Sequence, residues 1–185
     1  MAISIVTHRG LDPDKGAVFP MESSIEAFSD HLDRGYGIEF DVRFTEDGKI
    51  VVIHDGNLKR LRKCHNDRVI DEMTLEEILG TDFGGNHLTD FQTLIELIKA
   101  KQQSDQISAL HIKSGMQAED KVSVILEAIV SSGIDPKKLI IFDLKIETAK
   151  LIKSKWPQFQ LSASVSHPYD VERFNDAVGN TLLTM

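Results

Sequence analysis

The chain has 185 residues, of which 41% are hydrophobic and 27% charged, a composition that suits one soluble domain with a buried core. Its formal net charge of −8 argues against nucleic acid or an acidic membrane surface as a general partner. No stretch approaches the roughly 20 apolar residues that span a bilayer, so no stable membrane insertion is predicted. Cys64 is the only cysteine, which excludes a disulfide within the chain. Because the N-terminus also lacks a basic signal region, a cytoplasmic protein is the simplest interpretation.

Strand-like and helix-like segments alternate along the whole chain. A helix is predicted to begin at Ser23, because Glu26 follows at capping-box spacing, and another at Thr74, with Glu77 at the same spacing. The predicted strands are 3–8, 38–44, 50–54, 107–113, 138–142, 159–165 and 181–184. The predicted helices are 23–35, 74–79, 90–103, 118–132, 146–155 and 169–177.

Strands joined by helical crossovers predict a parallel α/β sheet. Strict strand–helix order fits a doubly wound sheet or a TIM (β/α)₈-type barrel. A barrel needs eight strands and about 250 residues, whereas this pattern contains seven strands. We therefore expect residues 1–185 to form a single TIM-type barrel domain that is incomplete after strand 7. The open seam between its first and last strands would be covered by a further C-terminal segment or by a homodimer partner.

Polar residues mark the ends of the first three predicted strands. His8 and Arg9 end the first, His54 ends the third, and Glu39 and Asp41 share one face of the second because side chains alternate along a strand. Two carboxylates at this spacing suit a hard cation, the histidines suit proton transfer, and an arginine suits a phosphate. An ordinary structural interpretation stays open, in which the carboxylates lie on the solvated face of an antiparallel strand and the histidines are satisfied polar groups.

A second polar cluster ends the strand 107–113, where His111 and Lys113 share one face. A lysine at an inward strand end is costly unless it meets an anion, although it could also reach solvent. Asp143 and His167 follow the next two strands and are weaker candidates for contacting a substrate. Three further histidines, on helices or loops, are expected to be solvated: His31, His65 and His87.

Five motifs occur in a fixed order in the first part of the chain: His8-Arg9-Gly10, Glu22-Ser23-Ser24-Ile25-Glu26-Ala27-Phe28, Glu39-Phe40-Asp41-Val42, Thr45-Glu46-Asp47-Gly48 and His54-Asp55. They continue in Leu58-Lys59-Arg60, Met73-Thr74-Leu75-Glu76-Glu77 and Lys113. In order and spacing the chain resembles the glycerophosphodiester phosphodiesterase family. The resemblance is dense over 5–79, thinner to 113 and mainly architectural beyond.

This resemblance implies a TIM-type barrel, a divalent metal ion and a small-molecule phosphodiester substrate, hydrolysed to glycerol 3-phosphate and an alcohol. The family residues that match His8 and His54 act as general acid and base. Those that match Glu39 and Asp41 bind the metal ion. Those that match Arg9 and Lys113 hold the phosphate.

The chain departs from the family pattern in two motifs as well as in its missing last strand. His111 stands where the family usually has a metal-binding glutamate, so we expect His111 as the third ligand. The family resemblance implies Mg²⁺ or Ca²⁺, whereas an imidazole ligand favours Mn²⁺ or Zn²⁺. Met21-Glu22-Ser23 replaces the usual Pro-Glu-Asn, and a helix-capping role is predicted for Ser23. Two alternatives stay open: a catalytically weak phosphate-ester-binding protein, or a sphingomyelinase-D-like phospholipase.

Overall fold

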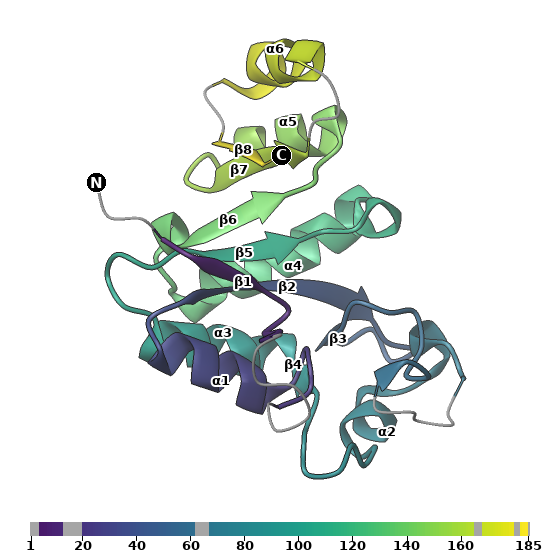
Figure 1. Ribbon diagram of the computed structural model, residues 1–185. Coiled ribbons are helices and arrows are strands. Elements are labelled where there is room, and N and C mark those ends of the chain that lie inside the picture. The colour runs from purple at the N-terminus through teal and green to yellow at the C-terminus, as the bar shows by residue number, and fades with distance from the viewer. Residues whose placement is uncertain (1–3, 13–19, 62–66, 165–167, 180–181, 185) are drawn as a thin grey trace. The chain divides into compact units, whose positions relative to one another are not determined.

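The computed structural model describes residues 4–12, 20–61, 67–164, 168–179 and 182–184, so Cys64, His65 and His167 lie outside the described residues. The chain divides into two compact units, Met1–Ile107 and Ser108–Met185, which are described separately below (Figure 1). Within the described ranges, no helix combines the length and the apolar character that crossing a membrane requires.

The strands of the first unit run in both directions. β1 (Val6–His8) is parallel to β2 (Gly37–Phe44), whereas β3 (Ile50–Val52) is antiparallel to β2, and β4 (Thr89–Asp90) is antiparallel to β3. The prediction of an all-parallel sheet is therefore wrong for this unit. The connection between β2 and β3 is a tight turn, closed by a hydrogen bond from Thr45 N to Lys49 O (2.9 Å). So short a connection cannot cross over to a parallel strand, and the chain folds back as a hairpin.

Two helices cover the apolar face of β2. Figure 1 shows α1 (Ile25–Asp33) and α3 (Phe91–Lys101) side by side. Phe28 of α1 and Phe40 of β2 are fully buried, and the Phe40 ring lies 6.3 Å from that of Phe91. Because side chains alternate along β2, burying this apolar face turns Glu39 and Asp41 to the opposite face.

The N-cap of α1 lies one residue after the predicted one. Ser24, not Ser23, caps the helix, and its hydroxyl accepts a hydrogen bond from Ala27 N (3.2 Å). Glu26 therefore does not complete a capping box; its carboxylate instead accepts hydrogen bonds from the backbone N and the ring of His87. The predicted capping box of α2 (Leu75–Leu79) is confirmed, because Thr74 and Glu77 exchange both bonds.

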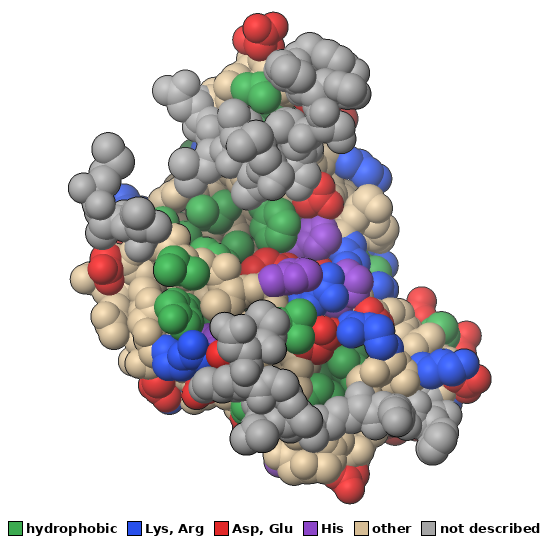
Figure 2. Space-filling view, viewed as in Figure 1, with side chains coloured by type: hydrophobic (Ala, Val, Ile, Leu, Met, Phe, Trp, Pro, Cys, Tyr) green, Lys and Arg blue, Asp and Glu red, His purple; other side chains and the backbone are tan. Residues whose placement is uncertain are grey.

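The described residues 56–61 and 67–88 contribute to a hydrophobic cluster around β3, a 3-10 helix η3 (Ile70–Glu72) and α2. Its buried members are Met21, Val51, Ile53, Leu58, Leu61, Ile70, Met73, Ile78, Phe83 and Leu88. Basic and acidic side chains lie close together at the lower right of Figure 2. Arg68 Nη1 lies 2.9 Å from Glu77 Oε1 of α2. The apolar cluster thus fixes the loop that follows the β2–β3 hairpin.

The second unit has the predicted parallel strand–helix order. Neighbouring strands β5 to β8 pair in parallel, and α4, α5 and α6 form the crossovers. The strands are β5 (Ser108–His111), β6 (Leu139–Phe142), β7 (Gln160–Ser164) and β8 (Leu182–Thr184). The helices are α4 (Glu119–Ser132), α5 (Ile146–Lys155) and α6 (Pro168–Val178), with the 3-10 helices η4 (Ser114–Met116) and η5 (Pro136–Lys138).

Candidate active site

The register of β1 and β2 brings the first two motifs together. His8 is the register partner of Glu39, and His8 Nε2 lies 3.8 Å from Glu39 Oε2. The next residue, Arg9, donates its backbone N–H to the Glu39 backbone oxygen (3.1 Å) and carboxylate (3.2 Å). The His8-Arg9 motif and the Glu39 carboxylate are thereby held in one place by backbone geometry.

The β2–β3 hairpin places His54 near the carboxylates of β2. Val42 pairs with Val52, and Ile53 N donates to Asp41 O at 3.0 Å. His54, the next residue, therefore lies beside the part of β2 that carries Glu39 and Asp41. Sequence analysis placed His54 at the end of a parallel strand. The structure brings it to the expected residues by the opposite strand direction.

Buried carboxylates outnumber buried cations around Arg9. Glu22, Glu39 and Asp41 are 9%, 8% and 2% exposed. Arg9 Nε lies 3.5 Å from Asp41 Oδ2, and Arg9 Nη1 lies 4.0 Å from Glu22 Oε1. Buried charge is costly unless it is compensated, and hard oxygen ligands suit Mg²⁺ or Ca²⁺. Glu39 and Asp41, two residues apart on one strand face, therefore fit a divalent cation.

The backbone is strained where it passes the candidate site. Arg9 has φ +55°, Ser23 has φ +59°, and Ser23 N donates to Arg9 O at 2.8 Å. Gly10 has φ +70°, and a Cβ built on it would lie 3.0 Å from Ala27 Cβ. Among the described residues other than glycine, Asp143 is the third with positive φ. Strain of this kind gathers at functional sites, where surrounding contacts hold it in place.

The environment of His8 favours the neutral imidazole. Burial first, and then the positive charge of Arg9, lower its pKa below the ordinary value of 6.5. Asp41 and Glu22 act in the opposite direction but do not reverse the shift. A neutral imidazole can accept a proton, as a general base must.

The sequence predicts that Asp55 either fixes the turn after His54 or orients its imidazole, and it indicates no role for Arg43 or Arg60. His54 Nδ1 lies 2.7 Å from Asp55 Oδ1, and Arg60 Nε donates to Asp55 Oδ2 at 2.6 Å. Arg43 donates to the His54 backbone oxygen. The Leu58-Lys59-Arg60 motif was the available signal, but spacing alone does not show which side chain an arginine meets.

In the second unit, the ends of β5 and β6 form a polar cluster. His111 Nε2 lies 3.0 Å from Asp143 Oδ2, and the His111 ring stacks on Phe142 with centroids 4.9 Å apart. Gln117 ties the following loops together by donating to Ile112 O (2.7 Å) and Asp143 O (2.8 Å), while Lys145 N donates to Gln117 Oε1 (2.8 Å). Lys113 lies two residues after the end of β5 and is the N-cap residue of η4.

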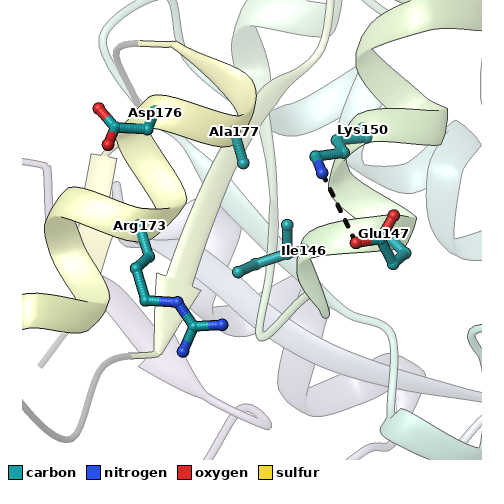
Figure 3. A pocket seen from close by; sticks show the side chains of 6 residues that line it. All are labelled: Ile146, Glu147, Lys150, Arg173, Asp176 and Ala177. Carbon is teal, nitrogen blue, oxygen red and sulfur yellow. Dashed lines mark ion pairs between the residues drawn. The ribbon is translucent and has the colours of Figure 1, made fainter.

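A separate groove lies between α5 and α6 (Figure 3). Its polar lining is of both signs, and Lys150 Nζ lies 3.6 Å from Glu147 Oε1 across one turn of α5. The lining residues are Ile146, Glu147, Lys150, Arg173, Asp176 and Ala177. Mixed, mutually neutralising charges give it no preference for one ligand class, so the strand-end residues are the candidate site.

An α/β fold with histidines, buried carboxylates and an arginine at strand ends is typical of barrel-type enzymes. The family model described as the glycerophosphoryl diester phosphodiesterase family matches residues 8–180. The chain belongs to this family.

Individual relatives agree with this assignment. A glycerophosphodiester phosphodiesterase of Caldanaerobacter subterraneus is 34% identical over 125 residues, which are 63% of this chain and 47% of the relative. The chain spans about half the length of the curated relatives it matches.

Two solved structures share the fold. A candidate glycerophosphodiester phosphodiesterase from Galdieria sulphuraria has a TM-score of 0.79 at 20% identity, covering 97% of this chain and 74% of the other. An Oleispira antarctica phosphodiesterase in complex with the product sn-glycerol 3-phosphate has a TM-score of 0.71 at 17% identity, covering 99% and 84%. The predicted TIM-type barrel fold class is confirmed.

Proposed function

We propose that the protein is a metal-dependent phosphodiesterase that hydrolyses glycerophosphodiesters to glycerol 3-phosphate and an alcohol. The observation that carries this proposal is the convergence of His8, Arg9, Glu39, Asp41 and His54 in the first unit. Membership of the family supports the reaction class, and the product bound to the Oleispira antarctica relative supports the glycerol phosphate part of the substrate.

Glu39 and Asp41 would hold the metal ion, and we assign His111 of the second unit as the third protein ligand. When bound, a divalent cation polarises the phosphoryl oxygens and offsets the charge that develops on them. Arg9 and Lys113 are assigned to the phosphate, because a guanidinium fork and an ammonium group both favour an anionic oxygen.

His8 and His54 are assigned to proton transfer. Water oxygen bonds to phosphorus, the bond between phosphorus and the alcohol oxygen breaks, and the departing oxygen needs a proton. One imidazole accepts the proton of the attacking water, and the other donates a proton to the alcohol. The lowered pKa of His8 keeps its imidazole neutral and able to accept a proton at neutral pH.

Hydrolysis of glycerophosphocholine by the purified protein, with Mg²⁺, Ca²⁺, Mn²⁺ or Zn²⁺ added, tests the assignment. His8→Ala and His54→Ala should each remove nearly all turnover while the protein stays folded. His87→Gln is the matched control, because within the described part of the chain the side chain of that exposed histidine pairs with Glu26 and with none of the proposed site residues. Turnover that survives both alanine substitutions would contradict the assignment.

The metal preference follows from the His111 ligand. Imidazole favours Mn²⁺ or Zn²⁺ over Mg²⁺ or Ca²⁺. His111→Glu should shift the affinity order toward Mg²⁺ and Ca²⁺, as measured by calorimetric titration of each ion. An unchanged order of metal affinities in His111→Glu would show that His111 is not a metal ligand.

A second candidate function is phosphate-ester binding with weak or no catalysis. It is favoured by the replacement of the usual family glutamate with His111, whose Nε2 contacts Asp143. Binding of glycerol 3-phosphate without turnover in any of the four metals would support it. Release of choline from lysophospholipid would instead support a sphingomyelinase-D-like activity.

Cellular location and assembly remain separate proposals. We propose a cytoplasmic protein, tested by cell fractionation. We also propose a homodimer, which is tested by the mass of the protein in solution.

A further inference from the structure

His54 is held by two arginines that act on different parts of the residue. Arg43 contacts its backbone, and Arg60 contacts Asp55, which contacts its ring. We propose that Arg43 and Arg60 are positioning residues that set the place and the tautomer of the His54 imidazole. The inference deepens the proposed function, on which its catalytic part rests.

The ring contact selects one nitrogen for proton transfer. Asp55 Oδ1 lies 2.7 Å from His54 Nδ1, and Arg60 Nε donates to Asp55 Oδ2 at 2.6 Å, so both carboxylate oxygens have partners. An ionised carboxylate only accepts hydrogen bonds, so Nδ1 carries the hydrogen. In the neutral ring, Nε2 then holds the lone pair and is the nitrogen that exchanges a proton.

The charge state of Asp55 agrees with this geometry. Burial by itself would raise its pKa, but the hydrogen bonds from Arg60 and His54 outweigh burial and lower the pKa below the ordinary value. Asp55 is therefore a carboxylate at neutral pH. A carboxylate that accepts from one nitrogen of a histidine fixes both the orientation and the tautomer of the ring.

The backbone contact fixes the position of the whole residue. Arg43 donates from Nε (3.0 Å) and Nη2 (2.9 Å) to the His54 backbone oxygen. Arg43 follows Asp41 by two residues on β2, so the fork ties His54 to the strand that carries the carboxylates. The two donors of a planar guanidinium restrict direction as well as distance.

Arg60 also connects His54 to the loop that follows β1. Its Nη2 donates to Glu22 Oε1, and the same oxygen lies 4.0 Å from Arg9 Nη1. Glu22 and Asp55, the two carboxylates on the Arg60 guanidinium, raise its pKa further. One side chain thus joins the proposed proton-transfer histidine to the proposed phosphate-binding arginine. Arg60→Lys keeps the charge but cannot reproduce two directed contacts from one planar group.

The test compares Arg43→Gln, Arg60→Gln and Arg60→Lys with wild type. Asp55→Ala serves as a reference without the ring contact. The matched control is Arg68→Gln, which removes a similar arginine–glutamate pair in the same unit, joined to α2. The first readout is the ¹⁵N spectrum of the His54 ring, which reports its tautomer and needs no turnover. The second is the separate effect on kcat and KM for glycerophosphocholine.

When the His54 ring is neutral, wild type should show the Nδ1–H tautomer, and Asp55→Ala should move the ring toward Nε2–H. Arg60→Gln should shift the ring the same way and lower kcat by about 10- to 100-fold, with KM within about twofold. Arg60→Lys should recover part of kcat. Arg43→Gln should broaden or move the His54 signals through loss of the backbone anchor, and Arg68→Gln should leave both readouts unchanged.

An unaltered His54 spectrum in folded Arg43→Gln and Arg60→Gln would overturn the positioning roles, whatever the activity. If Arg60→Gln fails to fold, Arg60→Lys tests the role of Arg60 instead. A shifted His54 tautomer together with an unchanged kcat in Arg60→Lys would contradict the inference. Absence of hydrolysis by wild type would reject the proposed function only. The ring spectrum would still decide whether the arginines hold His54.

Discussion

His8 and Glu39 are register partners on two parallel strands, and their side chains meet at 3.8 Å. The pairing places a titratable imidazole beside a carboxylate that is only 8% exposed. The register of the two strands depends on backbone hydrogen bonds, so we expect it to persist when either side chain is shortened.

The buried carboxylates should dominate metal affinity. We predict that Glu39→Gln and Asp41→Asn each weaken Mn²⁺ binding by at least about tenfold, because a neutral amide is a poorer ligand than a carboxylate. Titration calorimetry measures the change. Glu96→Gln, a half-exposed carboxylate on α3, should bind as wild type does. Equal affinity in Asp41→Asn and wild type would contradict the ligand assignment.

Gly10 should tolerate no side chain. It combines φ +70° with a Cβ position 3.0 Å from Ala27 Cβ, so Gly10→Ala should lower the free energy of unfolding by about 1–3 kcal/mol. Gly84→Ala separates the two causes, because Gly84 has φ +67° with no atom within 4 Å of an added Cβ. Urea denaturation should show a smaller loss for Gly84→Ala; similar losses would mean that the contact with Ala27 contributes nothing.

Gln117 should stabilise the loops after β5 and β6. Its amide makes hydrogen bonds with Ile112, Asp143 and Lys145. Loss of these bonds in Gln117→Ala should cost about 1–3 kcal/mol and speed hydrogen exchange at Lys145 N. Gln160→Ala, which removes a single exposed bond to Lys137 O, should change stability by less than about 0.5 kcal/mol. An unchanged rate of hydrogen exchange at Lys145 N in Gln117→Ala would contradict this stabilising role of Gln117.

The contact between Glu26 and His87 should make stability depend on pH in the acid range. Burial alone would raise the pKa of Glu26, but hydrogen bonds from His87 lower it below the ordinary 4.5. A carboxyl group with a lower pKa in the folded state stabilises the fold above the unfolded value. That contribution is lost as the pH falls through the folded pKa.

Glu26→Gln should therefore be less stable than wild type at pH 7, with the difference shrinking below about pH 4.5. Urea unfolding at pH 7 and pH 3.5 measures it. Glu127→Gln, an exposed position on α4, is the control and should differ from wild type equally at both values. A Glu26→Gln difference that grows on acidification would show the opposite sign of linkage.

The sequence correctly predicted those helix ends that depend on contacts between residues close together in the chain. Thr74 and Glu77 form the predicted capping box because both partners lie within one helical turn. Ser23 was wrongly predicted to start α1. Its backbone N donates to Arg9 O, in a distant part of the sequence, and its φ is +59°, which is not a helical value. His31 was expected to be solvated but is 1% exposed, with Nδ1 2.5 Å from Thr7 Oγ1. Both errors concern contacts between distant residues.

The sequence by itself determined the chemical groups of the site, because residue type and strand alternation fix which side chains share a face of β2. Only the tertiary structure decided how His54 reaches them. The turn after β2 is too short for a crossover, so His54 returns on an antiparallel strand. Only the folded structure showed that Arg43 contacts the His54 backbone oxygen and that Arg60 contacts Asp55, because the direction of a long side chain depends on partners that spacing does not reveal.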